Sequence, residues 1–426
     1  MDKKPSRYDK YSAPKYVNHE RKLTEFVPPE KIAEKEIKNG EKIEIKVKAN
    51  DVEPEDNQNS SENSAIESKP KSKNKYLKFF TKKPVIIIIV LILIAGGLSG
   101  YYLISRKTVK AVPKTVQKVV APTPKKPVSN LVPSNLTGLM VDPSLNNLPV
   151  TGVMIENSVF ARPQSGLGSA GVVFEALAEG GISRFLALYQ DTSPNSVGPI
   201  RSARPYYISW DLGFDAPYSH VGGSPEALSD IQNWSVKDLN QFYNGNYYQR
   251  ISSRAAPHNV YTSIARLNQL EASDGFGKSI FTSWQRKADS PLKIPTAKTI
   301  NLTLSSSDYN VTYTYNPSTN EYLRDEGGAP HIDANTNTQI SPKVVIAIVV
   351  PWNLEADGYH LAYQTIGSGT AYIFQDGGVT IGQWSKSSNN SQILFTDSSN
   401  QPIKLNAGQT WITAIGDSNS VAYTPN

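Results

Sequence analysis

The chain has 426 residues, a formal net charge of +6 at pH 7 and no cysteine, so disulfides, thiolate nucleophiles and cysteine-ligated metals are excluded. The positive charge is unevenly distributed, because residues 131–426 contain 17 Lys and Arg against 23 Asp and Glu, a net charge near −6. A nucleic-acid-binding surface covering a whole domain is therefore not expected.

Residues 1–83 are polar and rich in Lys, Glu, Asn and Ser, with 20 basic and 15 acidic side chains. They sustain no apolar periodicity, and such a segment cannot bury enough apolar surface to offset the entropy lost on ordering. The sequence therefore predicts a disordered tail over this segment.

An uncharged apolar run extends from Val85 to Ile104, and about 20 such residues are enough for a helix to cross a bilayer. We therefore expect a transmembrane helix over residues 84–105. A cleaved signal peptide is the alternative, but a leader of 83 residues before the apolar run is much longer than an ordinary n-region.

The charges that flank this run indicate its orientation. Seven Lys and Arg precede it in residues 69–83, and five follow it in residues 106–120. This bias favours a single-pass protein of the plasma membrane, with its N-terminal tail in the cytoplasm and residues 107–426 outside. Residues 106–130 mix Pro, Lys and Val without a core pattern and are typical of an extended stalk.

Residues 131–294 are predicted to form an α/β or α+β domain. The segment "LPVTGVMIEN" is a strand candidate, and "GVVFEALAEGGISRFLALYQD" predicts two strands around a Glu-Gly-Gly turn, the second alternating between two faces. A helix is expected over "PYYISWDLGF", with Pro205 in its first turn. In "APYSHVGGSPEALSDIQ" a strand and a glycine turn lead into a helix capped by Ser224, with Pro225 in its first position. This order is typical of α/β domains.

Residues 295–426 are predicted to form a separate, mainly β domain. The runs "NVTYTYN", "TAYIFQDGGVTIGQWSK" and "KLNAGQTWITAI" are short and are interrupted by glycine turns. The run "KVVIAIVV" is apolar on both faces and indicates a buried central strand.

Arginine is unusually frequent in residues 151–260, which contain six arginines and one lysine, whereas residues 1–83 contain two arginines among 20 basic side chains. Arginine offers a planar, always-charged fork that binds carboxylate or phosphate through two hydrogen bonds. Two alternatives remain open: the arginines hold an anionic ligand, or they pair internally with Glu156, Glu175 and Glu179 as buried ion pairs.

The glycine turn at Gly222 and Gly223 supports the hypothesis that this region binds an anionic ligand. Gly222 and Gly223 allow a close approach of the backbone, and the helix after Ser224 presents free N–H groups to an anion. His220 and His258 are candidates for general acid or base catalysis. The full candidate ligand-binding set is Arg184, Arg201, Arg204, Arg254, Gly222, Gly223, Ser224, Glu175, Glu179 and Asn259.

Neither a metal site nor a cofactor is expected, because no His-x-x-x-His pair occurs and Asp and Glu appear singly. Serine hydrolysis is disfavoured, because the Gly-x-Ser-x-Gly pattern does not occur around Ser202 or Ser224.

A set of ordered motifs over about residues 148–420 closely resembles the YerB-like lipoproteins, the family of domain of unknown function 3048, including its C-terminal domain. The resemblance implies a bacterial envelope protein without an assigned activity. Because the chain has no cysteine to acylate, the helix at 84–105 is expected to replace the lipid anchor. The motifs are "VMIENSVFARPQSGL", "GVVFEALAEGGISRFLALYQ", "VGPIRSARPYYI", "YSHVGGSPEAL", "RAAPHNVYTS", "AYIFQDGGVTIGQWSKSS" and "LNAGQTWI".

A looser similarity links the order of strand, "GPIRSAR" and glycine turn to the LytR-CpsA-Psr enzymes, which hold the pyrophosphate of a lipid-linked glycan with arginines. Three hypotheses follow. The folded part binds an anionic wall or lipid-linked glycan component, it is an enzyme that acts on such a substrate, or it is a structural module that docks a membrane or wall partner.

Overall fold

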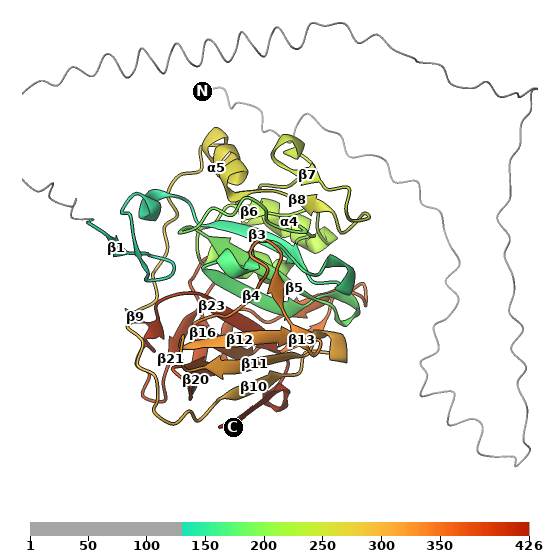
Figure 1. Ribbon diagram of the computed structural model, residues 1–426. Coiled ribbons are helices and arrows are strands. Elements are labelled where there is room, and N and C mark those ends of the chain that lie inside the picture. Colours follow the sequence, from blue (N-terminus) through green and yellow to red (C-terminus); the bar gives the residue numbers. More distant parts are fainter. Residues whose placement is uncertain (1–129, 426) are drawn as a thin grey trace, which may run out of the picture. The chain divides into compact units, whose positions relative to one another are not determined.

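A nine-stranded mixed sheet lies at the centre of residues 130–425, which are the residues that the computed structural model describes (Figure 1). Strands from both predicted domains contribute to it, since the N-terminal half provides four and the C-terminal half five. The order across the sheet is β21 (Leu394–Thr396), β20 (Gly378–Lys386), β19 (Gly367–Gln375), β16 (Val344–Val349), β23 (Thr410–Ile415), β4 (Val172–Leu177), β5 (Ser183–Tyr189), β3 (Thr151–Glu156) and β6 (Tyr218–Ser219).

The predicted tail, transmembrane helix and most of the stalk fall in residues 1–129, outside the described residues. Within residues 130–425, no helix is both long enough and apolar enough to cross a bilayer.

The predicted strands of the N-terminal half are confirmed. β4 and β5 form an antiparallel pair around the Glu-Gly-Gly turn, and β3 pairs with the other edge of β5. All three strands are buried on both faces, which explains their nearly continuous apolar sequence. The side chains of β5 alternate as expected, with Leu186 and Leu188 in one core and Phe185 and Ala187 in the other.

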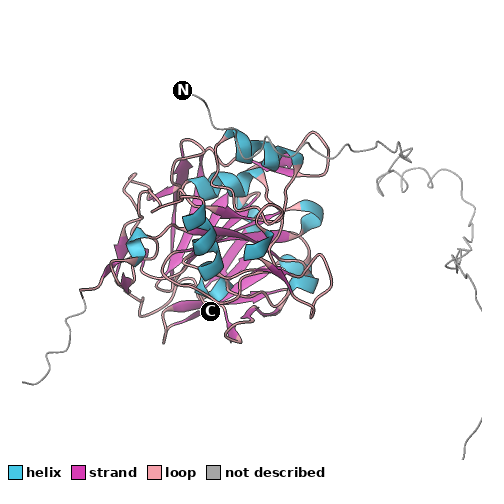
Figure 2. Ribbon diagram, turned by 90° about the horizontal axis from the view of Figure 1, so that it is seen from above, coloured by secondary structure: helices cyan, strands magenta, loops and turns pink. Residues whose placement is uncertain are grey.

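Two of the described α-helices cover one face of the sheet, and Figure 2 shows helices lying over its strands. α3 (Pro205–Leu212) begins at its proline, as predicted, and packs Trp210 flat against Phe174 of β4 with 5.2 Å between ring centroids. Tyr206 and Tyr207 are buried and donate hydrogen bonds to backbone carbonyls of the sheet. These bonds allow polar aromatic rings to lie in the core.

α4 (Pro225–Asn233) lies beside α3 and also confirms its sequence signals. Its N-cap is Ser224, whose Oγ accepts the N–H of Ala227 at 3.2 Å. Ala227 and Ile231 are the buried residues of this helix, and they extend the core beneath α3.

The other face of the sheet is covered by α5 (Ile264–Ser273) and by a second, five-stranded sheet. β16 is buried between β19 and β23, as its sequence predicts. The order of the second sheet is β13 (Ala329–Pro330), β12 (Glu321–Glu326), β11 (Val311–Asn316), β10 (Thr299–Leu302) and β24 (Val421–Thr424).

The remaining strands form short pairs. They are β1 (Val132–Pro133) with β2 (Met140–Val141), β7 (Gln249–Arg250) with β8 (Val260–Tyr261), β9 (Arg286–Lys287) with β22 (Leu405–Asn406), β14 (Ile332–Asp333) with β15 (Thr338–Gln339), and β17 (Trp352–Leu354) with β18 (Leu361–Tyr363).

Candidate functional site

Two of the predicted ligand-binding arginines share one buried carboxylate. Arg184, on β5, donates from Nη2 to Glu179 Oε2 at 2.7 Å, and Arg204 donates from Nε to the other oxygen of Glu179. The side chains of the three residues are 7% to 10% exposed. Burial lowers the pKa of Arg184, and the neighbouring Arg204 lowers it further. This cluster contains one more positive charge than negative.

Arg201 contacts a different carboxylate. Its Nε lies 3.3 Å from Oε1 of Glu156, the last residue of β3, and its side chain is 29% exposed. The same oxygen accepts a hydrogen bond from His258 Nδ1 at 2.9 Å, whereas Oε2 of Glu156 is buried and has no hydrogen-bond partner among residues 130–425. Arg204 is extended just before α3 begins, so the two arginines of "GPIRSAR" serve separate carboxylates rather than one shared site.

Arg254 has no carboxylate partner within residues 130–425. Its guanidinium donates to two backbone carbonyls, those of Phe160 at 3.1 Å and Pro163 at 2.7 Å. The ring of Phe160 is 73% exposed and lies 5.8 Å from the imidazole of His258. Arg254 therefore carries an unneutralised charge beside a half-buried histidine and an exposed aromatic ring.

We call Glu156, Phe160, Arg201, Arg254 and His258 the His258 surface. It contains two guanidinium groups and one carboxylate, that of Glu156, and the side chain of His258 is 20% exposed. The predicted candidate Asn259 is next in sequence, and its side-chain oxygen accepts a hydrogen bond from Arg250 at 2.8 Å.

The predicted glycine turn is organised by internal contacts. His220 is fully buried, and its ring nitrogens contact Gly222 O at 2.7 Å and Asp238 Oδ1 at 2.9 Å, so neither nitrogen faces solvent. Gly222 has a φ of 62°, a left-handed conformation that favours glycine. Ala203 pairs with Gly223 in an isolated bridge. These contacts explain why His220 and the two glycines occur in this turn without a bound ligand.

Glu175 lies far from solvent, on β4 between the two sheets. It forms an ion pair with Arg324 of β12 at 2.9 Å, and both side chains are 0% exposed. It also accepts hydrogen bonds from Trp411 Nε1 at 3.1 Å and from Ser183 and Thr413 at 3.2 Å each. The guanidinium of Arg324 lies 4.4 Å from the ring centroid of Trp411. Arg324 could not be predicted as a partner of Glu175 from the sequence, because the two residues are 149 positions apart.

A second missed group lies in the loop between β17 and β18. Glu355, Asp357 and His360 place one ligand atom each within 4.8 Å of one another. His360 Nε2 also lies 3.6 Å from Glu179 Oε1, which links this loop to the Arg184 and Arg204 cluster. The sequence signal is the short stretch "EADGYH", whose spacing differs from the patterns on which the expected absence of metal was based.

Within the described residues, these elements define an α+β protein with three α-helices and a mainly β C-terminal half. Models of the protein of unknown function DUF3048 match the chain, the N-terminal domain over residues 136–277 and the C-terminal domain over residues 300–412. The chain belongs to this family.

A relative from Bacillus subtilis is named "Putative lipoprotein YerB". It is 29% identical over 322 residues, which cover 74% of this chain and 92% of the relative. The crystal structure of YerB from Bacillus subtilis has a TM-score of 0.63 and 26% identity, and the match covers 68% of this chain and 99% of that structure.

Proposed function

We propose that this chain is a cell-envelope protein, attached to the membrane with its folded part outside the cytoplasm, and that it binds an anionic envelope component at the His258 surface. The lipoprotein name of the Bacillus relative supports the envelope location. The apolar run from Val85 to Ile104 supports attachment by a helix, since the chain has no cysteine for a lipid anchor.

The unneutralised charge of Arg254 is the observation that carries the binding proposal. A guanidinium held by two backbone carbonyls keeps other N–H groups for a ligand, and it prefers carboxylate or phosphate. Arg201 shares the carboxylate of Glu156 with His258 and adds a second positive group. A phosphate group, as in a lipid-linked sugar or a phosphorylated wall polymer, fits this arrangement.

Arg254→Gln is expected to weaken binding of pyrophosphate or a short polyprenyl pyrophosphate about 10-fold or more, because charge-assisted hydrogen bonds contribute about 1.5–3 kcal/mol. Affinity is measured as the ligand-dependent rise in the melting midpoint of the full-length protein in detergent. Tryptophan fluorescence is suitable, because all six tryptophans lie in the described part of the chain.

Arg266→Gln is the matched control. Arg266 lies on α5 and contacts Gln249 Oε1 at 3.1 Å, and it is not one of the residues of the His258 surface. The Arg266→Gln variant should bind the same anions as the parent protein, with the same affinity. The absence of a midpoint shift in the parent with every anion, or equal shifts in the Arg254→Gln variant, would contradict the proposal.

A second candidate is an enzyme that acts on the same ligand, favoured by the hydrogen bond from His258 Nδ1 to Glu156. A carboxylate in this position fixes the imidazole and leaves Nε2 for proton transfer. His258→Gln is then expected to keep anion affinity and to reduce release of the polyprenyl phosphate from a lipid-linked glycan by about 10²- to 10⁴-fold. Undiminished release by this variant would remove His258 from the mechanism.

A further inference from the structure

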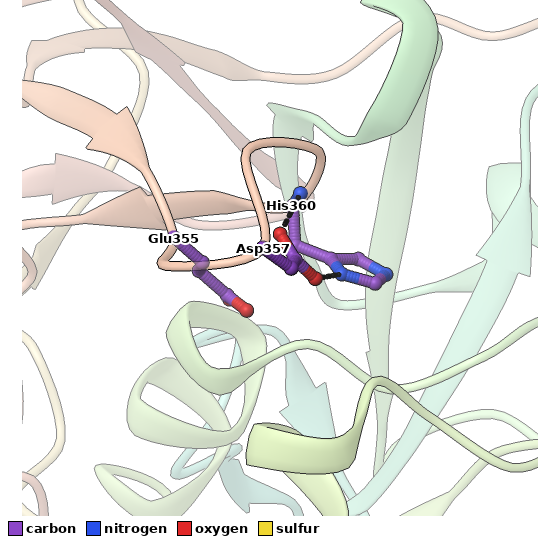
Figure 3. A group of neighbouring side chains, drawn as sticks. All are labelled: Glu355, Asp357 and His360. Carbon is purple, nitrogen blue, oxygen red and sulfur yellow. Dashed lines mark hydrogen bonds and ion pairs between the residues drawn. The ribbon is translucent and has the colours of Figure 1, made fainter. Parts of the chain in front are cut away.

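The loop between β17 and β18 brings an imidazole and two carboxylates together within six residues (Figure 3). Asp357 Oδ1 accepts the backbone N–H groups of Tyr359 at 2.9 Å and His360 at 3.0 Å, which fixes the turn. The other oxygen of Asp357 accepts a hydrogen bond from His360 Nδ1. Glu355 closes the loop, because its N–H donates to His360 O at 2.7 Å.

A carboxylate from a different element faces this loop. Glu226, in the first turn of α4, interacts with the side chain of Glu355 both through its charge and through a hydrogen bond. A cation between two facing carboxylates relieves their mutual repulsion, as a shared proton also does.

We propose that Glu355, Asp357 and His360, with Glu226 as a fourth donor, form a site for a divalent transition-metal ion such as Zn²⁺ or Mn²⁺. Mixed imidazole and carboxylate donors suit these ions, whereas Mg²⁺ prefers oxygen donors alone. Bonds of about 2.1 Å place tetrahedral ligand atoms about 3.4 Å apart, so donors now within 4.8 Å need small side-chain rotations to close on an ion. The ion replaces the proton shared by Asp357 and His360.

This site is independent of the His258 surface, but it adjoins the arginine cluster through the 3.6 Å approach of His360 Nε2 to Glu179 Oε1. The proposal can therefore fail or succeed separately from the proposed anion binding, because metal is added alone.

The test is calorimetric titration of metal-free, tag-free full-length protein in detergent with Zn²⁺, Mn²⁺ or Mg²⁺. We expect one Zn²⁺ or Mn²⁺ per chain, bound at least about 10-fold more tightly than Mg²⁺. Asp357→Asn and His360→Gln should each weaken binding by about 10-fold or more. Asp397→Asn is the matched control, because Asp397 Oδ1 likewise accepts two backbone N–H groups, of Ser399 and Gln401, but lies in another loop.

Melting midpoints of the metal-free variants distinguish the loss of a metal ligand from a loss of folded structure. If Asp357→Asn lowers the midpoint of the metal-free protein, Glu355→Gln gives the decisive measurement, since the amide keeps a hydrogen-bonding group toward Glu226 and removes the negative charge. Two results would contradict the proposed metal site. The first is that neither Zn²⁺ nor Mn²⁺ binds stoichiometrically, and the second is that Glu355→Gln and His360→Gln leave the affinity for the ion unchanged. A preference for Zn²⁺ over Mg²⁺ that stays unchanged in the His360→Gln variant would exclude the imidazole as a ligand.

Discussion

Arg324→Met is expected to lower the free energy of unfolding by about 3–5 kcal/mol at pH 7, the loss typical of breaking a buried ion pair from one side. Glu175 would then remain between the two sheets without its cation. Glu326, which lies 3.5 Å from Arg324 and 3.2 Å from Arg162, would lose one of its two positive neighbours. Burial already raises the pKa of Glu326 to about 7, so the site cannot hold another unpaired charge. Urea unfolding followed by tryptophan fluorescence measures the loss, because Trp411 lies against Arg324.

The double variant Arg324→Met with Glu175→Gln is the control for this mechanism. It removes both charges of the pair, and a buried ion pair replaced on both sides is often nearly neutral. We therefore expect the double variant to be more stable than Arg324→Met alone. A double variant that is less stable than the single one, or a single variant that loses under about 1 kcal/mol, would show that Arg324 acts through packing rather than charge.

Glu179→Gln is expected to lower the free energy of unfolding by a similar amount, about 3–5 kcal/mol. The substitution keeps the shape of the side chain but leaves Arg184 and Arg204 as two buried like charges. The pKa of Arg184 is already lowered by burial and by Arg204, yet a guanidinium does not lose its proton in proteins. The destabilisation is measured by the same urea unfolding.

Two comparisons test the charge argument for Glu179. Arg204→Gln should cost less than Glu179→Gln, because it leaves a balanced pair of Arg184 and Glu179. Glu321→Gln should cost under about 1 kcal/mol, since Glu321 lies nearer the surface and contacts Ser341 at 3.1 Å. The reverse ranking of the two cluster variants would reject the assignment of Glu179 as the charge that holds this cluster together.

The arginines therefore divide between the two alternatives that the sequence left open. Arg184 and Arg204 pair internally, and the structure explains them without a ligand. Arg201 and Arg254 are partly exposed; Arg201 contacts Glu156, and Arg254 has no carboxylate partner among residues 130–425. The binding proposal depends on the second pair alone, so variants of the first pair report on stability and variants of the second on affinity.

The local elements of the fold could be predicted from the sequence. The proline and serine signals located the starts of α3 and α4, and the apolar runs located β3, β4, β5 and β16. These features depend on contacts between near neighbours and on a repeating pattern of burial, which a linear sequence displays. The family resemblance likewise required only the ordered motifs, and the matches over residues 136–277 and 300–412 confirm it.

The pairing of charges was decided only by the tertiary structure. Glu156 meets His258 across 102 residues, and Glu175 meets Arg324 across 149. The sequence shows an excess of arginine but not which carboxylate each one reaches, because that depends on strand order: β23, from the end of the chain, lies between β16 and β4. The same long-range packing brings Glu226 of α4 toward Glu355. Chain composition thus determined which charges are available, and the mixed sheet determined which of them are neutralised.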